Sequence, residues 1–405
     1  MPSIIPKTVA KVSLNTDKEG RLWNWLLARQ GLSEGRKFTT TLGVASASLG
    51  LHAARLQSPF ATVLARTGSP SVAAELFAAQ SRNSLITIRC MRKTLHTLPI
   101  HMAAVAHAAT VHFRERDALR AIENAGMLRR DIERIIEDVA GLLSKIGPAP
   151  HRHIEKKLYS QRRSVQAIRL AVKLAWESGR LVYLNDSAGW NREDRQFALP
   201  ADLYPGLEMD LDRNKATADL IETYFDRYGP ASIRDSMWWS GLSSSAIASG
   251  LQSAGREVIE LQTSWTDAPL FMFRDRFDEF LGDDLKGQDI DKFTLNFLAH
   301  EDVALKAYFE SRNRYLDGIP MRAAFNQIGE ALPTILLGGR VVGVWNWNRR
   351  TMQVEWSAIS NRISLPLRKH VIDRAGVLSD AFRQWVVPRK TSTNLELDFR
   401  EVPAS

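Results

Sequence analysis

Cysteine is nearly absent from this chain, and its scarcity limits both compartment and chemistry. Cys90 is the single cysteine among 405 residues, so no disulfide can form within the chain and no multi-cysteine metal site is available. A reducing compartment suits such a sequence, and we expect a cytoplasmic protein.

Long apolar runs are missing as well. The most apolar tract, 98–111, is shorter than the roughly 20 residues that a membrane-spanning helix needs, and it contains His101 and His107. The N-terminus has no long apolar core behind its first lysines, so we predict no export signal. The sequence also has no Walker loop, His-Glu-x-x-His zinc motif, nucleotide-binding glycine fingerprint or Gly-x-Ser-x-Gly elbow. We therefore expect no membrane span, metal, nucleotide cofactor or other cofactor.

Acidic residues are outnumbered, with 45 Asp and Glu against 54 Lys and Arg, which gives a net charge of +9 and a pI near 9.7. Such a surface attracts polyanions such as nucleic acid, although excess positive charge also favours solubility. The segment 145–169 concentrates this charge around Tyr159, which is compatible with contacts to DNA phosphates beside an aromatic surface; a solvated helical face is the alternative. Its candidate DNA-binding residues are Lys156, Lys157, Arg162 and Arg163.

Two segments predict the same order of helix, tight stop and strand. Ser164 should cap a helix that stops at Gly179 before strand 180–184, and Ser244 should open one that stops at Gly255 before strand 256–261. The first strand should return through a hairpin to 197–199, and helices over 216–228 and 232–240 should precede the second copy. Three short helices and a hairpin make a winged helix, which either reads DNA or only packs.

After 269 the pattern changes to short strands at 334–337, 340–345 and 352–356. The pair Gly338-Gly339 between apolar runs predicts a hairpin, and a terminal helix should cover about 365–385. The patterns together predict an α+β protein of several subdomains, because the chain is too long for one ordinary core.

Several short motifs are each weak evidence for a family, but their order along the chain is fairly specific. They lie at 50–53 (Gly-Leu-His-Ala), 91–96, 228–231, 238–243, 277–281 and 337–345. In this order they resemble the YcaQ/AlkZ family of winged-helix DNA glycosylases, bacterial enzymes associated with alkylated purines and interstrand crosslinks. The resemblance implies three tandem winged helices that form a cupped DNA-binding surface, followed by a small C-terminal β-barrel. We expect the winged helices at 1–125 (with the candidate catalytic motif), 126–205 and 206–268, and the C-terminal subdomain at 269–405.

His52-Ala53-Ala54 stands where active family members look to have Gln, a hydrophobic residue, then Gln or Asp, which hold the attacking water. A cationic alkylpurine leaves readily, so such an enzyme needs mainly a positioned water and stabilisation of the developing sugar cation. Neutral His52 could accept a proton from that water, since its reference pKa lies near 6.5. Ala54 could neither position the water nor stabilise the sugar cation. The alternative interpretation of His52 is a structural histidine held by hydrogen bonds.

Other polar residues are candidates for supporting roles. Gln57 and Arg55 follow His52 and are candidates to assist it, although they also suit the capped or solvated start of a helix at Ser58-Pro59. A second polar element, at 92–96, would suit phosphate contacts on either side of a lesion. The alternative is that it forms a solvated turn. Its candidate DNA-binding residues are Arg92, Lys93, Thr94 and His96.

We therefore expect a monomeric, monofunctional and metal-free DNA glycosylase. It should hydrolyse the N-glycosidic bond of bulky or crosslinked alkylpurines in damaged double-stranded DNA and leave an abasic site. No lysine lies at the motif, so a Schiff-base route with strand cleavage is not favoured. The loss of a polar residue at Ala54 favours a rival interpretation, a non-catalytic winged-helix regulator or lesion sensor. Self-resistance in an organism that makes a DNA-alkylating metabolite is a third.

Overall fold

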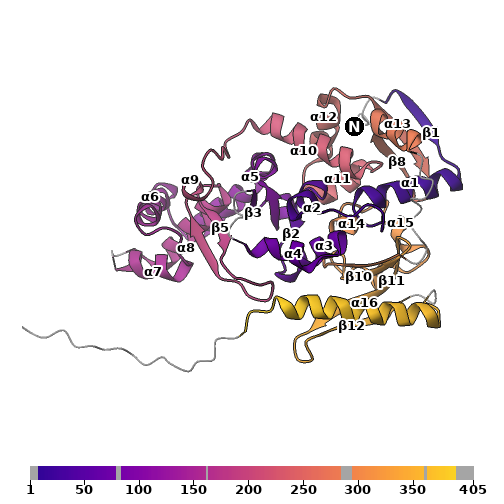
Figure 1. The fold of residues 1–405 in the computed structure, drawn as a ribbon. Helices are drawn as coiled ribbons and strands as arrows, with labels where there is room; N and C mark the ends of the chain where they lie inside the picture. The colour runs from indigo at the N-terminus through magenta and orange to yellow at the C-terminus, as the bar shows by residue number, and fades with distance from the viewer. Residues whose placement is uncertain (1–7, 79–83, 161–162, 284–293, 360–362, 389–405) are drawn as a thin grey trace, which may run out of the picture.

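The computed structural model describes residues 8–78, 84–160, 163–283, 294–359 and 363–388, and these form an α+β fold (Figure 1). Their strands make three open sheets of five, three and four strands, which helices cover. The α+β class predicted from the sequence is confirmed.

The five-stranded sheet holds the His52 motif at one edge. In spatial order its strands are β2 (Leu51–His52), β4 (Leu95–Pro99), β3 (Leu85–Arg89), β5 (Val182–Asn185) and β6 (Arg195–Ala198). All neighbours are antiparallel, and a single 3-10 turn, η3 (Met91–Lys93), connects β3 to β4. The hairpins β3–β4 and β5–β6 meet where Thr87 pairs with Tyr183, so the sheet combines two parts of the chain.

The N-terminal part supplies the helices around β2–β4. They are α1 (Thr16–Arg29), α2 (Thr41–Ala47), α3 (Gln57–Thr67), α4 (Pro70–Ala74) and α5 (Ile100–Asn124), with the 3-10 turn η1 (Glu75–Phe77). The start of α3 beside Ser58-Pro59 agrees with the predicted helix start. None of the helices described, α5 included, is both long and apolar enough to cross a membrane.

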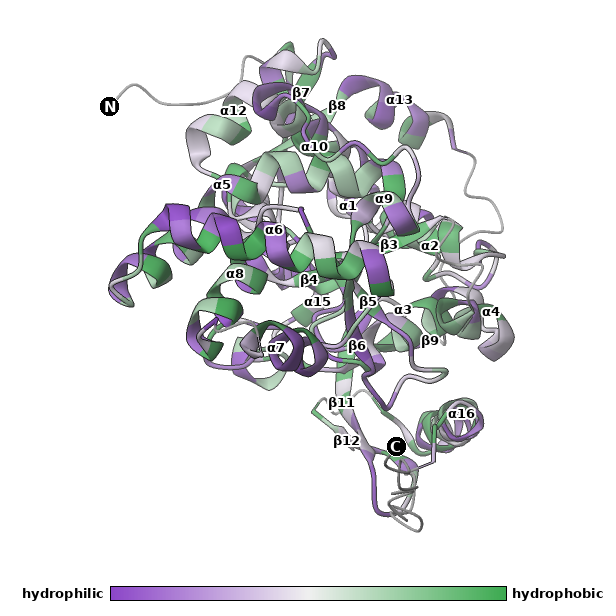
Figure 2. Cartoon of the chain, turned by 90° about the vertical axis from the view of Figure 1, so that its left-hand side faces the viewer, coloured by the Kyte–Doolittle hydropathy of each residue, from purple (hydrophilic) through white to green (hydrophobic). Residues whose placement is uncertain are grey.

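Three helices precede the hairpin β5–β6: α6 (Arg129–Ile146), α7 (His151–Tyr159) and α8 (Val165–Glu177). Figure 2 shows hydrophilic and hydrophobic residues alternating along α6 and α7, which is typical of helices with one buried face. Ser164 caps α8 by accepting a hydrogen bond from the Ala167 backbone N–H, and Gly179 has φ +80°. The predicted order of helix, stop and strand is confirmed here, and α9 (Pro200–Leu203) follows β6.

The same order recurs in the three-stranded sheet. Its strands are β1 (Ala10–Ser13), β7 (Val258–Thr263) and β8 (Thr266–Phe273), and the helices before them are α10 (Arg213–Tyr228), α11 (Ile233–Ser240) and α12 (Ser244–Ser253). The cap of α12 is Ser243, one residue before the predicted Ser244, because the Ser243 hydroxyl accepts from the backbone N–H of Ala246. β1 adds to this sheet in parallel with β7, so the N-terminus packs against a distant part of the chain.

The four-stranded sheet occupies the C-terminal part. Its spatial order is β12 (Gln353–Ala358), β11 (Arg340–Asn348), β10 (Thr334–Leu337) and β9 (Leu295–Leu298). The accompanying helices are α13 (Arg274–Gly282), α14 (Val303–Lys306), α15 (Asn313–Leu316), the 3-10 turn η4 (Met321–Ala323) and α16 (Leu365–Gln384). The Gly338-Gly339 hairpin and the terminal helix are confirmed; both glycines have positive φ, as a two-residue hairpin turn requires.

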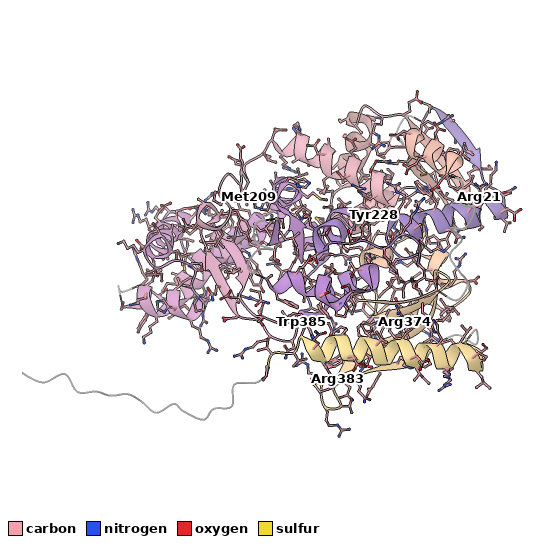
Figure 3. All side chains as sticks on the ribbon, viewed as in Figure 1. Arg21, Met209, Tyr228, Arg374, Arg383 and Trp385 are labelled. Carbon is pink, nitrogen blue, oxygen red and sulfur yellow. The ribbon has the colours of Figure 1, made fainter. Side chains whose placement is uncertain are left out.

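The small C-terminal β-barrel implied by the resemblance is wrong. Among the described strands, β9 and β12 stay at opposite edges of an open sheet. Helix α16 runs alongside this sheet (Figure 1), and its Phe382 ring packs against Trp345 and Trp347, at 5.9 and 5.3 Å between centroids. The helix thereby covers the apolar side chains that a barrel would enclose. Figure 3 labels Arg374 and Arg383 along this helix and Trp385 just beyond its end.

A buried ion pair joins the N-terminal helices to the C-terminal sheet. Arg66 on α3 makes a bidentate contact with Asp302, at 2.9 and 2.7 Å, and neither side chain is more than 1% exposed. Asp302 also caps α14 by accepting from the Ala304 backbone N–H. This pair therefore fixes α14 against the part of the chain that carries His52.

Candidate active site

His52 lies on the edge strand β2, directly opposite His96 on β4. The His52 side chain is buried, and its Nδ1 has no hydrogen-bond partner. Two residues later the chain reaches the surface, where Ala54 and Arg55 are exposed. The motif thus runs from a buried imidazole to solvent within one short segment.

The rings of two other histidines surround His52. His96 lies edge-on at 5.4 Å between ring centroids, and His300, which follows β9, lies at 6.3 Å. Both are buried, and Nδ1 of His300 has no hydrogen-bond partner either. Buried polar atoms normally find a partner, so an unpartnered ring nitrogen is a place for a water or substrate group.

Lys306, the last residue of α14, contacts His96. Its Nζ lies 3.0 Å from His96 Nε2 and 3.5 Å from Thr94 Oγ1. Because an ammonium group only donates, Nε2 must accept, and the His96 proton belongs on Nδ1, 3.1 Å from the Thr94 carbonyl oxygen. Lys306 therefore fixes the tautomer and the orientation of the ring that packs against His52.

Glu301 is the buried carboxylate of this cluster. Its Oε2 lies 4.0 Å from Lys306 Nζ and 3.6 Å from Arg92 Nη1, and its Oε1 accepts from the Ala331 backbone N–H at 2.7 Å. Glu301, Arg92 and Lys93 all have positive φ, at 54°, 50° and 61°. Non-glycine residues rarely adopt this conformation, and such strain gathers at functional sites.

Burial and positive charge keep the histidines neutral. Burial, followed by the charge of Lys306, holds the pKa of His52 far below its usual value, and the same causes lower that of His96. Burial lowers the pKa of His300 to about 4 and that of Lys306 to about 8. At neutral pH His52 is an uncharged imidazole with one nitrogen that can accept a hydrogen bond.

The two predicted assistants of His52 have different surroundings. Arg55 is exposed, and its charge is among the causes that lower the pKa of His300, so it lies near the cluster. Gln57 is half-buried at the first position of α3, and no hydrogen bond within the described residues joins its side chain to His52.

The residues predicted to contact phosphates near the motif divide into two groups. Arg92 and Lys93 keep 23% and 41% of their side chains exposed, although Lys93 pairs with Asp117 and Arg92 stacks on Trp238 at 3.8 Å. His96 is 1% exposed and hydrogen-bonded to Lys306, so in this conformation it does not reach a phosphate. Thr94 donates to the Met91 carbonyl oxygen.

The second predicted group lies around α7, away from β2 (Figure 1). Lys156 and Lys157 are exposed there, whereas Arg163 pairs with Asp138 at 2.7 Å. Arg162 lies outside the described residues.

Sequence reasoning missed Lys306, Glu301 and His300. They lie more than 240 residues after His52, and no spacing within the sequence signals that α14 packs against β4. No lysine lies near His52 in the sequence, as expected. In the folded chain, however, Lys306 contacts the ring of His96, which packs against His52.

Comparisons with known proteins show the family and the fold of the chain. A family model described as DNA glycosylase AlkZ-like matches residues 46–380. Among solved structures, Streptomyces sahachiroi DNA glycosylase AlkZ is similar, with a TM-score of 0.70 and 18% identity over 93% of this chain and 97% of that one. At this identity the likeness shows a shared fold. A search of curated proteins finds no match. Because the family model covers well over half of the chain, the protein belongs to the AlkZ-like DNA glycosylase family.

Proposed function

We propose that this protein is a monofunctional DNA glycosylase that releases bulky or crosslinked alkylpurines from double-stranded DNA and leaves an abasic site. The observation that carries the proposal is His52: a buried, neutral imidazole with an unpartnered nitrogen, at the motif of a DNA glycosylase family. Such a nitrogen can accept a hydrogen bond from a bound water and thereby orient it.

The reaction is a hydrolysis at the sugar. The oxygen of a water bonds to C1′ of the deoxyribose, the bond from C1′ to the purine nitrogen breaks, and its electron pair leaves with the base. A cationic N7-alkylguanine thereby departs as a neutral molecule. His52 accepts a hydrogen bond from the water and orients it, the proton that the water loses passes to the solvent, and Lys306 holds His96 so that His52 keeps its orientation.

Glu301 supplies the second polar role that Ala54 cannot. A carboxylate next to a developing sugar cation stabilises it, and Glu301 is the buried acid nearest to Lys306 in this cluster. Its contacts to Arg92 and Lys306 are 3.6 and 4.0 Å, longer than those of a tight ion pair, so part of its charge stays available. Arg55 and Gln57 remain candidates for assisting the water.

The DNA contacts are proposed from exposed cations. Arg92 and Lys93, with Thr94 beside them, flank the motif, and Lys156, Lys157, Arg162 and Arg163 would hold phosphates farther along the duplex. Three tandem winged helices over 1–125, 126–205 and 206–268 would present these residues, with 269–405 closing the site through Lys306 and Glu301. We propose that the protein acts as a monomer.

The test is the release of free base from a duplex that carries N7-alkylguanine, measured after subtraction of spontaneous depurination. We expect free alkylguanine and an abasic site in equal amounts. The rival interpretation, a non-catalytic DNA-binding protein, is favoured by Ala54. Saturating binding without release would support that rival, and affinity that depends on sequence rather than damage would identify a regulator.

A further inference from the structure

A hollow of about 430 Å³ lies beside the turn η3, where α5 and the N-termini of α10 and α12 come together. The polar side chains that line it are Arg92, Lys93, His112, Arg116, Arg213 and Ser243. Phe113 and Leu242 form its apolar walls. The hollow therefore joins three segments that are far apart in the sequence, and most of its polar groups are cations.

Two of these cations have no acidic partner in the part of the chain that the structure describes. Arg116 and Arg213 are exposed, and none of the ion pairs found there includes them. Both lower the pKa of His112, after burial, which places their charges around the same ring. Asp117, the residue after Arg116, pairs with Lys93, and the charge of Arg116 also lowers the pKa of Asp117. The residues that line the hollow include four cations and no acid, so the field inside it is positive.

The backbone adds further hydrogen-bond donors. Helix α12 has ten residues, and its N-cap Ser243 and residue Ala246 line the hollow, so the positive end of the helix faces it. Gly241, also in the lining, has φ +81° and no side chain, which leaves the approach to the Arg92 backbone open.

We propose that this hollow binds a phosphate of the DNA backbone and thereby fixes the register of the DNA relative to His52. The inference rests on the proposed function, because it takes DNA as the ligand. Lys93 in the lining lies three residues before His96, which pairs with His52, so the hollow is next to the segment that carries the motif's neighbour. Arg116 and Arg213 bind the phosphate, and α12 donates to it.

The experiment compares the protein with its Arg116→Gln/Arg213→Gln variant in binding to a duplex that carries a stable abasic-site analogue, across a series of salt concentrations. Each lost phosphate contact should reduce the slope of log affinity against log salt by about 0.9. Because both arginines hold one phosphate, the slope of the double variant should fall by about 0.9, and its affinity at 0.1 M salt should fall by about eightfold.

A matched control removes the same charge elsewhere. Arg349 and Arg350 are exposed at the turn between β11 and β12, which lies at the opposite end of the molecule from α12 (Figures 1 and 2). The Arg349→Gln/Arg350→Gln variant should keep the slope of the unmodified protein. An equal loss of slope in both variants, or no loss in either, would overturn the proposal.

Binding to the analogue requires no chemistry, so this result is separate from the test of base release. A protein that binds with the expected slopes but releases no base would contradict the proposed function and leave the phosphate site supported.

Discussion

Replacement of Lys306 by Met should stabilise the protein while slowing base release. Lys306 is fully buried, its nearest carboxylate is 4.0 Å away, and its hydrogen bonds go to His96 and Thr94. A charged amine in such surroundings destabilises the fold, because burial disfavours the charged form. Functional sites often contain residues that destabilise the fold, as this buried charge does.

The magnitude follows from the lysine pKa. Burial, partly offset by Glu301, lowers it from 10.5 to about 8. A difference of about 2.5 at about 1.4 kcal/mol per pKa unit gives a destabilisation of about 3 kcal/mol at pH 7. The variant leaves His96 Nε2 without its donor, which costs about 1 kcal/mol. We expect a net gain of about 2 kcal/mol in the free energy of unfolding.

The gain should depend on pH. Below about pH 8 both folded and unfolded chains carry the charged lysine, so the full destabilisation is present. Between about 8 and 10.5 the unfolded chain binds the proton and the folded chain does not, so the stability of the unmodified protein rises with pH. Urea unfolding of both proteins at pH 7 and pH 10 should therefore show a difference that shrinks at the higher pH.

Base release by the Lys306→Met variant should fall about tenfold or more, because the His96 ring loses the contact that orients it. Lys37→Met is the control: burial also lowers its pKa to about 8, but it hydrogen-bonds to Gly31, Ala65 and Asn296, and its removal should leave base release unchanged. A Lys306→Met protein that is less stable at both pH values would refute the reasoning, since the lysine would then support the fold.

Two further predictions concern charge. Because burial and Lys306 keep the pKa of His52 far below its usual value, kcat/KM for base release should stay level from pH 8 down to about pH 5; an acid limb near 6.5 would mean that His52 titrates as an ordinary histidine. Asp302→Asn should lower the free energy of unfolding by about 3–5 kcal/mol, because it leaves the fully buried Arg66 charge unpaired. The Arg66→Met/Asp302→Leu double variant should recover most of that loss in urea unfolding, and equal loss in both variants would argue against the charge as the cause.

Local features of this fold could be predicted from the sequence because their causes are local. Ser164 and Ser232 cap helices within three residues of themselves, and Gly338-Gly339 provides the positive φ that a two-residue turn needs. The predicted N-cap of α12, Ser244, is one residue away from the observed cap, Ser243, because several serines follow one another there. Whether the C-terminal sheet stays open or closes into a barrel could not be predicted from the sequence. The outcome depends on where α16 packs, which no local pattern specifies.

The site was predictable in part for the same reason. His52 could be singled out as a candidate from its neighbours in the sequence, whereas the residues around it, His96, Lys306 and Glu301, are brought together by tertiary packing. The prediction that His96 contacts phosphate was reasonable for a polar turn. In the structure His96 is the second residue of β4 and pairs with His52. Burial, which decides its role, is a property of the folded chain.

We propose that His52 holds and orients the attacking water in the absence of a polar residue at position 54. The most direct measurement is the single-turnover rate of N7-alkylguanine release by the protein and by its His52→Ala variant, both at concentrations that saturate the DNA. The account predicts that release by the variant falls by about a hundredfold or more, towards spontaneous depurination, while affinity for the DNA is retained. Equal rates for the two proteins would contradict it and remove His52 from the mechanism.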